Sequence, residues 1–402
     1  MEYRKYIILG AGPAGLAFAR TLLDQGEESF VVLEKEAVAG GLCRSFEVDG
    51  APLDIGGGHF LDLKRQEVLD LLFRFLPQSE WREFKRISRI RLRETEIDYP
   101  LEVNLWQLPV ADQVDFLESI ARAACISGLP KPESFSEWIA WKLGDRIADE
   151  YMLPYNRKLW SLNLIDLGTY WLDKLPDLSF REILRSCLDR KPQGTIPAHG
   201  VFLYPACYGY GEVWKRMGAS LGEKLLFETP VNAIDLATKT VNNRFRAKTI
   251  ISTIPWPVWL EFAVLPERIA GLIRELIHVG VDIDYVPDSP GTLAHWVYDP
   301  DESVPHHRML CRQNFSAGRG YWTETNSKRA RASSGWRHRN DFAYPFNSIN
   351  KPAVMAELIH WGEENGVISI GRWGRWEHLN SDVAAADGIK SAMDCLTRGL
   401  QG

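Results

Sequence analysis

The sequence predicts an α/β fold that carries an inserted helical lobe and a mixed antiparallel sheet, and three observations lead to this prediction. At the N-terminus, the apolar run 6–9 is followed by a glycine-rich turn, a helical stretch and a second apolar run at 30–33, which is typical of buried parallel strands joined by a helix. From about residue 66 to 190 apolar residues recur at helical spacing, with an alternating stretch at 89–99 that predicts a hairpin. Strand patterns return later, at 225–227, 231–236, 249–253 and 367–370.

The order of these patterns predicts the domain organisation. Residues 1–65, 191–270 and 350–402 are expected to form one discontinuous α/β domain, residues 66–190 a mainly helical lobe, and residues 271–349 a sheet with a flap. The clearest helical patterns are at 112–126, 135–152 and 384–398.

Composition and charge exclude several classes of protein. The chain has 402 residues, 45% of them hydrophobic, which is enough for about two or three domains with a sizeable core. A net charge of −6 argues against a general nucleic-acid-binding protein, which would need a basic surface. The six cysteines show no CxxC pair and no zinc spacing, so reduced thiols in a cytoplasmic protein are expected. No run of apolar residues is long enough to predict a membrane span.

The glycine-rich turn indicates a nucleotide-binding site. Gly10 permits a tight turn, Gly12 lets the backbone approach a pyrophosphate, and Gly15 lets the helix pack closely on the strand. Glu34, at the end of the second strand, is placed to accept hydrogen bonds from both hydroxyls of an adenosine ribose, and its charge repels a 2′-phosphate. FAD or NAD is therefore expected rather than NADP. A glycine turn in some other α/β protein is the alternative.

Three further segments are typical of proteins that bind FAD in an extended conformation. Gly40 and Gly41 directly follow the ribose-binding strand. The glycines of residues 54–59 allow a flat ring to approach the backbone, and His59 is expected beside that ring unless it is only a surface histidine. In the C-terminal block 371–382, a strand end, glycines and a helix start are expected to close over the flavin, with Asp382 as the N-cap of the last helix.

Together with other motifs, these segments resemble UDP-galactopyranose mutases, a branch of the FAD-dependent amine oxidase and protoporphyrinogen oxidase superfamily, in an order most like that of the eukaryotic-type mutases. The resemblance runs from residue 6 to about residue 396. Its more specific motifs are Tyr99-Pro100, residues 151–160, Tyr204-Pro205, residues 209–214, residues 296–298, His307-Arg308, Tyr344-Pro345 and residues 371–382.

The resemblance implies a fold, a cofactor and a reaction. It implies a Rossmann-like FAD-binding domain of the glutathione-reductase type, formed by the discontinuous α/β part. The implied enzyme is an FAD-dependent isomerase that interconverts the pyranose and furanose forms of a UDP-sugar, as in cell-surface polysaccharide biosynthesis. The implied reaction proceeds through a flavin N5–sugar adduct, requires reduced FAD, with NADPH or NADH as reductant, and produces no net redox change.

The resemblance also implies site residues. The implied catalytic residues are His59, Arg308 and Arg372, and no metal is expected. The implied cofactor-binding residues are Gly10, Gly12, Pro13, Ala14, Gly15, Glu34, Lys35, Gly41, Leu42, Gly57, Gly58, His59, Val231, Gly371, Arg372, Asn380 and Asp382. The implied substrate-binding residues are Tyr99, Tyr151, Asn156, Trp160, Lys174, Tyr298, Arg308 and Tyr344.

The sequence departs from the pattern of the mutases at two places. A second arginine is missing from the stretch 171–175, where Lys174 supplies a point charge but no bidentate fork. Glu102 replaces a glutamine expected beside the uracil, and an ionised glutamate cannot donate a hydrogen bond, so the nucleotide is left open. The basic stretch 328–339 has no counterpart in the pattern and is expected to be a solvated flap or a phosphate-binding lid.

Two other functions remain open from the sequence. One is an FAD-dependent oxidoreductase of the amine oxidase or protoporphyrinogen oxidase type. The other is a flavin- and nucleotide-binding protein without catalysis. The motif 151–160 favours the mutase, because an oxidase needs no platform for a uracil. The oligomeric state and the sugar are not predicted.

Overall fold

The N-terminal pattern forms a strand, a helix and a second strand around the glycine turn, as predicted. In the computed structural model, which describes residues 1–172, 179–193 and 200–400, β1 spans Glu2–Leu9, α1 spans Pro13–Asp24 and β2 spans Phe30–Leu33. The two strands are parallel, in register from Tyr6↔Phe30 to Leu9↔Leu33. Their paired residues are all buried, which is why both runs are continuously apolar.

Strands from three parts of the chain complete this first sheet. Its order is β10-β11-β12-β1-β2-β9, with β18 paired to β12. The added strands are β9 (Leu225–Leu226), β10 (Ile234–Asp235), β11 (Thr240–Val241), β12 (Phe245–Ser252) and β18 (Val367–Ser369). The strand expected at 231–236 is therefore wrong in length, because only two of its residues find a partner strand.

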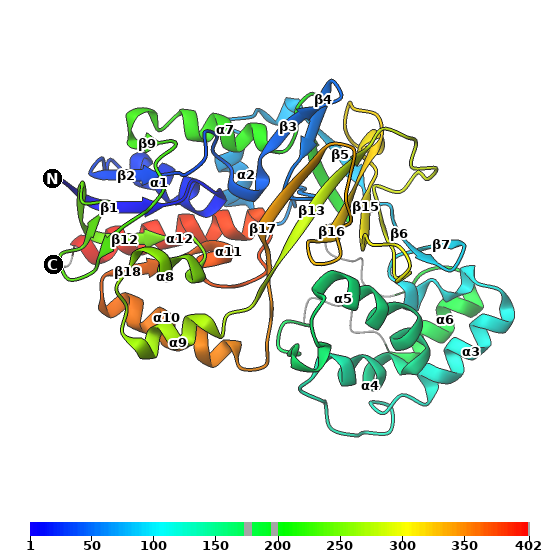
Figure 1. The fold of residues 1–402 in the computed structure, drawn as a ribbon. Helices are drawn as coiled ribbons and strands as arrows, with labels where there is room; N and C mark the ends of the chain where they lie inside the picture. The colour runs from blue at the N-terminus through cyan, green and yellow to red at the C-terminus, as the bar shows by residue number, and fades with distance from the viewer. Residues whose placement is uncertain (173–178, 194–199, 401–402) are drawn as a thin grey trace.

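Alternate residues of β1 face two different cores. Tyr6 and Ile8 pack with α1, α2 (Gln66–Leu72), α7 (Gly211–Ala219) and α12 (Ser381–Leu400). Ile7 and Leu9 pack with α9 (Glu267–Arg274) and α10 (Lys351–Glu364) on the opposite face. Figure 1 shows the sheet between these two helical layers.

A second sheet is mixed, as predicted, and its strands come from residues 88–98 and 278–345. Its order is β17-β13-β16-β15-β14-β6-β7; the pair β14 and β6 is parallel and the other pairs are antiparallel. The strands are β6 (Ser88–Leu92), β7 (Thr95–Asp98), β13 (His278–Val286), β14 (Trp296–Tyr298), β15 (Arg308–Leu310), β16 (Tyr321–Asn326) and β17 (Arg337–Pro345). The hairpin predicted near 89–99 is confirmed as β6 and β7.

The end of the basic stretch 328–339 belongs to this sheet, so the interpretation of the whole stretch as a flap or lid is wrong. Arg337 makes two hydrogen bonds to Asp284, at 2.7 and 2.9 Å. Arg339 does the same with Asp282, at 2.8 and 2.9 Å. The cause is the register of β17 against β13, which places each arginine beside an acidic residue.

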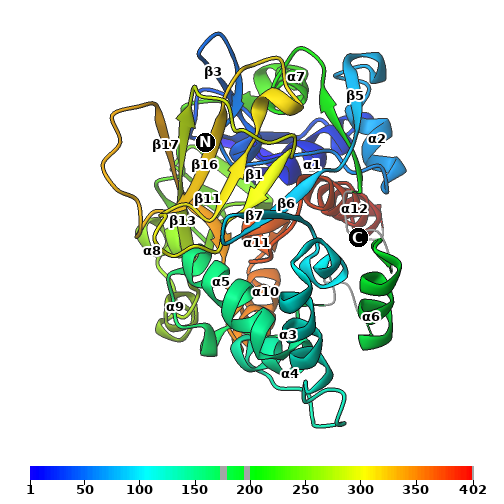
Figure 2. The same cartoon turned by 90° about the vertical axis from the view of Figure 1, so that its right-hand side faces the viewer.

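The inserted helical lobe lies at one end of the second sheet, as Figures 1 and 2 both show. Its helices are α3 (Val110–Ala121), α4 (Phe135–Ile147), α5 (Leu153–Trp160) and α6 (Phe180–Asp189), with a π-helical turn at Ala148–Met152 between α4 and α5. The remaining described elements longer than one turn are β3 (Ser45–Val48), β4 (Ala51–Asp54), β5 (Trp81–Lys85), β8 (Val201–Pro205), α8 (Trp259–Phe262) and α11 (Gly371–Gly374). No helix within the described residues is long and apolar enough to cross a membrane.

Replacing Gly388 with alanine is expected to destabilise the protein by about 1–3 kcal/mol, although alanine favours a helix. A Cβ at Gly388 would overlap the backbone carbonyl of Ala14, where α12 crosses α1. The control is Gly271→Ala in α9, where a Cβ meets no atom within 4 Å and a gain of about 0.5–1 kcal/mol is expected. The free energy of unfolding in urea measures both. Equal effects of the two substitutions would contradict the close crossing.

Candidate active site

The first part of the candidate site is the N-terminus of α1. Gly12 is the N-cap of this helix, no side chain caps it, and Pro13 follows. The first N–H groups, those of Ala14 and Gly15, have no acceptor within a helix and are available to an anion. A Cβ on Gly12 would meet no atom within 4 Å, so the space at the turn is open. A Cβ on Gly15 would overlap the carbonyl oxygen of Gly10, as expected for close packing of the helix on the turn.

Glu34 lies beside this turn at the end of β2. It is buried and accepts hydrogen bonds from the N–H groups of Ala11 at 2.7 Å and Glu36 at 3.0 Å. Val231 is half-buried. The chain just before Val231 lies close to Glu34, because a backbone N–H there donates a hydrogen bond to the Glu34 carbonyl oxygen. The side chain of Lys35 is 73% exposed and lies 3.8 Å from Glu36.

The second and third glycine segments continue from the first. A Cβ on Gly41 would lie 3.2 Å from the Cα of Gly12, so these two backbones are in close approach. A Cβ on Gly56 would overlap the carbonyl oxygen of Leu42. Gly57 has a φ of +92°, which favours glycine, and a Cβ there would lie 2.5 Å from Oε1 of Glu324. The predicted cofactor residues in these three segments therefore form a continuous backbone surface.

The C-terminal block closes on the start of α1. Gly371 has a φ of +72°, and a Cβ there would lie 2.6 Å from the Cβ of Ala14. The guanidinium of Arg372 donates hydrogen bonds to the carbonyl oxygens of Leu379 at 2.7 and 3.0 Å and of Ala343 at 2.9 Å. No ion pair of Arg372 with a carboxylate occurs within the described part of the chain, so its charge is not neutralised locally.

The start of α12 differs from the expected N-cap. The helix begins at Ser381, and Asp382 lies in its first turn, so the expectation of Asp382 as N-cap is wrong. Asn380 is exposed, and its carbonyl oxygen accepts from the N–H of Ala384 at 2.9 Å. Asp382 is instead buried against Arg65, with 2.6 Å between Oδ2 and Nη1, while Oδ1 has no hydrogen-bond partner among the described residues. An unsatisfied buried carboxylate oxygen fits a ligand that supplies a hydroxyl donor.

The structure brings the predicted catalytic residues His59, Arg308 and Arg372 together. Burial, with the charges of Arg372 and Arg308, lowers the pKa of His59 to about 4, so the imidazole is neutral at pH 7. Its Nδ1 lies 3.1 Å from the carbonyl oxygen of Gly57, and its ring stacks on Tyr210 with 6.1 Å between centroids. With Nδ1–H donating to this carbonyl, Nε2 remains an acceptor.

A buried glutamate holds Arg308. Glu324 lies directly opposite Arg308 in the pairing of β15 with β16, and its side chain is fully buried. Its Oε2 accepts hydrogen bonds from Nε at 2.8 Å and lies 2.6 Å from Nη2, while Oε1 accepts from the N–H of Gly58 at 3.1 Å. Burial alone would raise the pKa of Glu324, but the charge of Arg308 and the hydrogen bond from His307 outweigh it and lower the pKa to about 2. Glu324 is absent from the predicted site, although an acid inside the strand-like run 321–326 is a signal for a buried ion pair.

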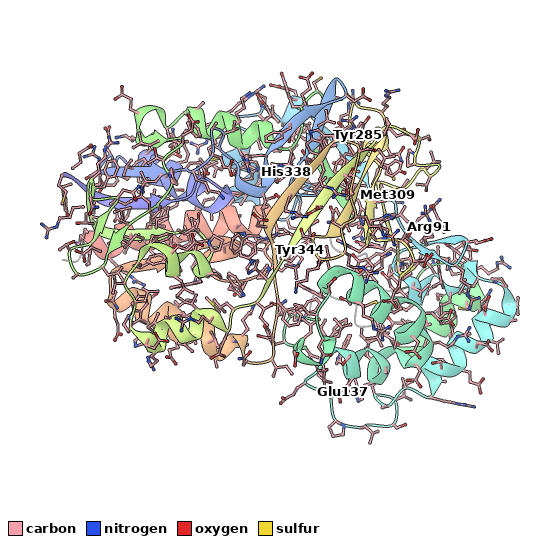
Figure 3. The ribbon with its side chains drawn as sticks, viewed as in Figure 1. Arg91, Glu137, Tyr285, Met309, His338 and Tyr344 are labelled. Carbon is pink, nitrogen blue, oxygen red and sulfur yellow. The ribbon has the colours of Figure 1, made fainter. Side chains whose placement is uncertain are left out.

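Arg308 retains one nitrogen for a ligand. Its Nη2 also donates to the hydroxyl of Tyr344 at 3.2 Å, whereas Nη1 has no hydrogen-bond partner among the residues that the structure describes. The side chain is 21% exposed. Tyr344 lies at the end of β17 that faces the helical lobe (Figure 3). A guanidinium fixed on one edge and open on the other is suited to bind an anion.

Four tyrosines form a chain from the second sheet into the helical lobe. The ring centroids of Tyr99 and Tyr298 are 5.3 Å apart, those of Tyr298 and Tyr155 are 5.6 Å apart, and those of Tyr155 and Tyr151 are 6.1 Å apart. Arg86 lies over Tyr99 at 4.6 Å and donates to the Tyr298 hydroxyl at 3.4 Å. Tyr155 and Arg86 are absent from the predicted substrate-binding residues. Tyr155 could have been found from its position within the motif 151–160, whereas no sequence pattern points to Arg86.

Two other residues predicted to bind the substrate, Asn156 and Trp160, bond and pack within the protein itself. The amide of Asn156 donates to the carbonyl oxygen of Met152 at 2.8 Å and accepts from the indole of Trp160 at 3.2 Å, so it bonds within its own segment. Trp160 is 2% exposed and packs edge-on against Phe346 at 5.3 Å, which is a core position. Lys174 lies outside the described residues.

The rest of the described chain offers a cavity but no metal site. A cavity of about 970 Å³ lies between α3 and α4, but none of its lining residues belongs to the predicted site. No group of three His, Cys, Asp or Glu side chains in the described ranges could hold a metal ion. The site residues do fit a flavin dinucleotide, because they provide an uncapped helix N-terminus, an open glycine turn and an unsatisfied carboxylate oxygen.

Comparison with known proteins gives a family match and similar folds. The model of the family described as "Flavin containing amine oxidoreductase" matches residues 13–282. The crystal structure of reduced UDP-galactopyranose mutase is similar over 98% of this chain and 94% of that chain, with a TM-score of 0.88 and 23% identity. Cyclohexylamine oxidase from Brevibacterium oxydans IH-35A is similar over 99% of this chain and 100% of that chain, with a TM-score of 0.69 and 17% identity.

One curated relative matches a short part of the sequence. It is an uncharacterized protein in the nifH2 3' region of Methanothermococcus thermolithotrophicus, 46% identical over 52 residues, or 13% of this chain. The match spans about half the length of that relative.

Replacing Gly12 with valine is expected to abolish flavin binding while leaving the fold intact. A Cβ at Gly12 has no described atom within 4 Å, so the added side chain enters the open space at the turn and blocks close approach of a pyrophosphate. The measurements are the flavin absorbance of the purified protein and its urea unfolding curve. Gly271→Val is the control, because a Cβ at Gly271 also has no described atom within 4 Å, its φ is not positive, and it lies in α9, away from the turn. Full flavin occupancy in Gly12→Val would contradict the assignment of this turn to the cofactor.

Proposed function

The chain belongs to the family of flavin-containing amine oxidoreductases, and from this premise we propose that it binds FAD and interconverts the pyranose and furanose forms of a nucleoside-diphosphate sugar. UDP-galactopyranose mutase, whose fold is similar along nearly the whole chain, carries out a reaction of this class according to its name. The backbone of the three glycine segments would hold the dinucleotide, with the N-terminus of α1 available to its phosphates and Glu34 to a ribose.

The observation that carries the proposal is the fixed position of Arg308. Glu324 and Tyr344 hold two of its nitrogens, and Nη1 is open toward a ligand beside the loop of Gly57 and Gly58. A leaving diphosphate requires a cation that is positioned before the bond breaks. Arg308 meets this requirement because the ion pair orients it without using all its donors.

The other residues of the cluster have distinct tasks. The chain of tyrosines provides flat surfaces on which a nucleobase can stack. Neutral His59 presents an acceptor nitrogen next to Arg308 and Arg372 without adding a third positive charge. The carbonyl contacts of Arg372 fix its charge near His59. Bound reduced FAD would supply the electron pair that attacks the anomeric carbon.

An oxidase is the second candidate, and the family match together with the fold of cyclohexylamine oxidase favours it. Such an enzyme takes a hydride from its substrate and passes electrons to oxygen. It has no need of an arginine that is fixed by an ion pair and keeps a nitrogen free for a diphosphate. We therefore place the mutase first.

The redox state required for turnover distinguishes these functions. The protein is incubated with a panel of nucleoside-diphosphate sugars, once oxidised and once reduced by dithionite under nitrogen, and the products are separated by chromatography and identified by NMR. We expect a ring isomer only from the reduced protein, at more than stoichiometric yield and without consumption of reductant.

The alternative results are equally distinct. Product formation that starts from oxidised protein, consumes oxygen in proportion and releases hydrogen peroxide would establish an oxidase and contradict the mutase. Binding without product in either redox state would indicate a non-catalytic nucleotide-binding protein.

A further inference from the structure

Glu102 is a largely buried acid that bonds to no other side chain among the described residues. It lies in the short turn Leu101–Val103 that follows β7, and it is 9% exposed. Burial raises the pKa of its carboxyl group, and the one hydrogen bond that opposes this effect comes from its own backbone. No ion pair and no hydrogen bond from another side chain reaches Glu102 within the described ranges.

The carboxyl group lies beside the chain of tyrosines. Burial is the main cause of the raised pKa of Tyr99 and of Tyr151, and the charge of Glu102 raises both further. Leu101 and Val103, on either side of Glu102, are buried in the same apolar cluster as Tyr151. Glu102 therefore adjoins the flat surfaces on which the proposed function places a nucleobase.

Stability of the fold does not explain this placement. A buried carboxylate without a donor is costly, and a buried acid in a protein normally has a partner, as Glu324 has in Arg308. Asn156, the other polar group predicted at the base, is bonded within its own segment. Glu102 thus has unused hydrogen-bonding capacity next to the tyrosines, and a ligand with N–H donors would satisfy it.

The two oxygens of a carboxylate can only accept hydrogen bonds. The edge of guanine presents two adjacent donors, N1–H and the amino group, which match the two oxygens in a bidentate pair. The edge of uracil presents one N–H between two carbonyl oxygens, so a carboxylate that binds it brings like partial charges together. A neutral glutamine would suit uracil, because an amide both donates and accepts.

We propose that Glu102 binds the edge of the nucleobase and that the substrate is a guanosine-diphosphate sugar rather than a uridine-diphosphate sugar. This inference rests on the proposed function, since it assigns the base of the nucleotide that the function requires. It names a specificity residue outside the catalytic cluster of His59, Arg308 and Arg372.

The test compares the affinities of GDP and UDP for the FAD-loaded protein by calorimetry at pH 8. Wild-type protein is expected to bind GDP at least tenfold more tightly than UDP. Glu102→Gln is expected to lower this preference at least tenfold, because the amide places a donor against the amino group of guanine. The control is Glu94→Gln, which removes an exposed acid from the turn between β6 and β7 and should leave the preference unchanged.

Two kinds of failure can be told apart by adding Arg308→Ala. If wild type prefers UDP or binds both equally, or if Glu102→Gln leaves the preference unchanged, the base assignment is overturned. If UDP binding is then weakened by Arg308→Ala, the proposed function survives. If neither diphosphate binds wild-type protein, the inference and the proposed function both fail. The flavin absorbance and thermal unfolding of each variant report whether its fold is retained.

Discussion

A buried ion pair joins the second sheet to the loop that carries the proposed cofactor ring site. Arg308 and Glu324 stand directly opposite each other on β15 and β16, and the second oxygen of Glu324 accepts the N–H of Gly58. One carboxylate thereby fixes a cation and a glycine loop at the same time. Gly57 has to be glycine partly because a Cβ would meet this carboxylate.

The ion pair also explains how a partly buried arginine can serve a ligand. Removing a guanidinium from water is costly unless it is paired and hydrogen-bonded. Glu324 and Tyr344 supply this compensation on one edge, and the open Nη1 leaves the other edge for an anion. Arg372 is held in a different way, because three hydrogen bonds to carbonyl oxygens fix its side chain without neutralising its charge. The two arginines therefore contribute different amounts of positive charge near His59.

Local sequence patterns account for the first domain and for part of the site. The strand, glycine turn and acid at 6–34 are predictable because each residue performs its role within one short segment, and Glu34 indeed faces Ala11. Glu324 could not be placed in the same way, since its importance arises from the strand pairing with Arg308, which no short segment specifies. Trp160 shows the converse: its type suggests a stacking surface, but packing on Phe346 places it in a core. The strand at the end of the basic stretch 328–339 is not evident from the sequence, because the acids that pair with Arg337 and Arg339 lie on β13, far away in the chain.

The dependence of stability on pH in wild type and Glu324→Gln tests the ion pair most directly. A pKa lowered from 4.5 to about 2 in the folded protein stabilises the fold above pH 4.5, and this stabilisation is lost as the pH falls toward 2. By this shift the contribution at pH 7 is about 3 kcal/mol. The variant should therefore be less stable than wild type at pH 7, and the difference in the free energy of unfolding in urea should shrink by about 2 kcal/mol between pH 6 and pH 3. A difference that stays constant over this range would show that Glu324 is not held ionised by Arg308 and would contradict the account.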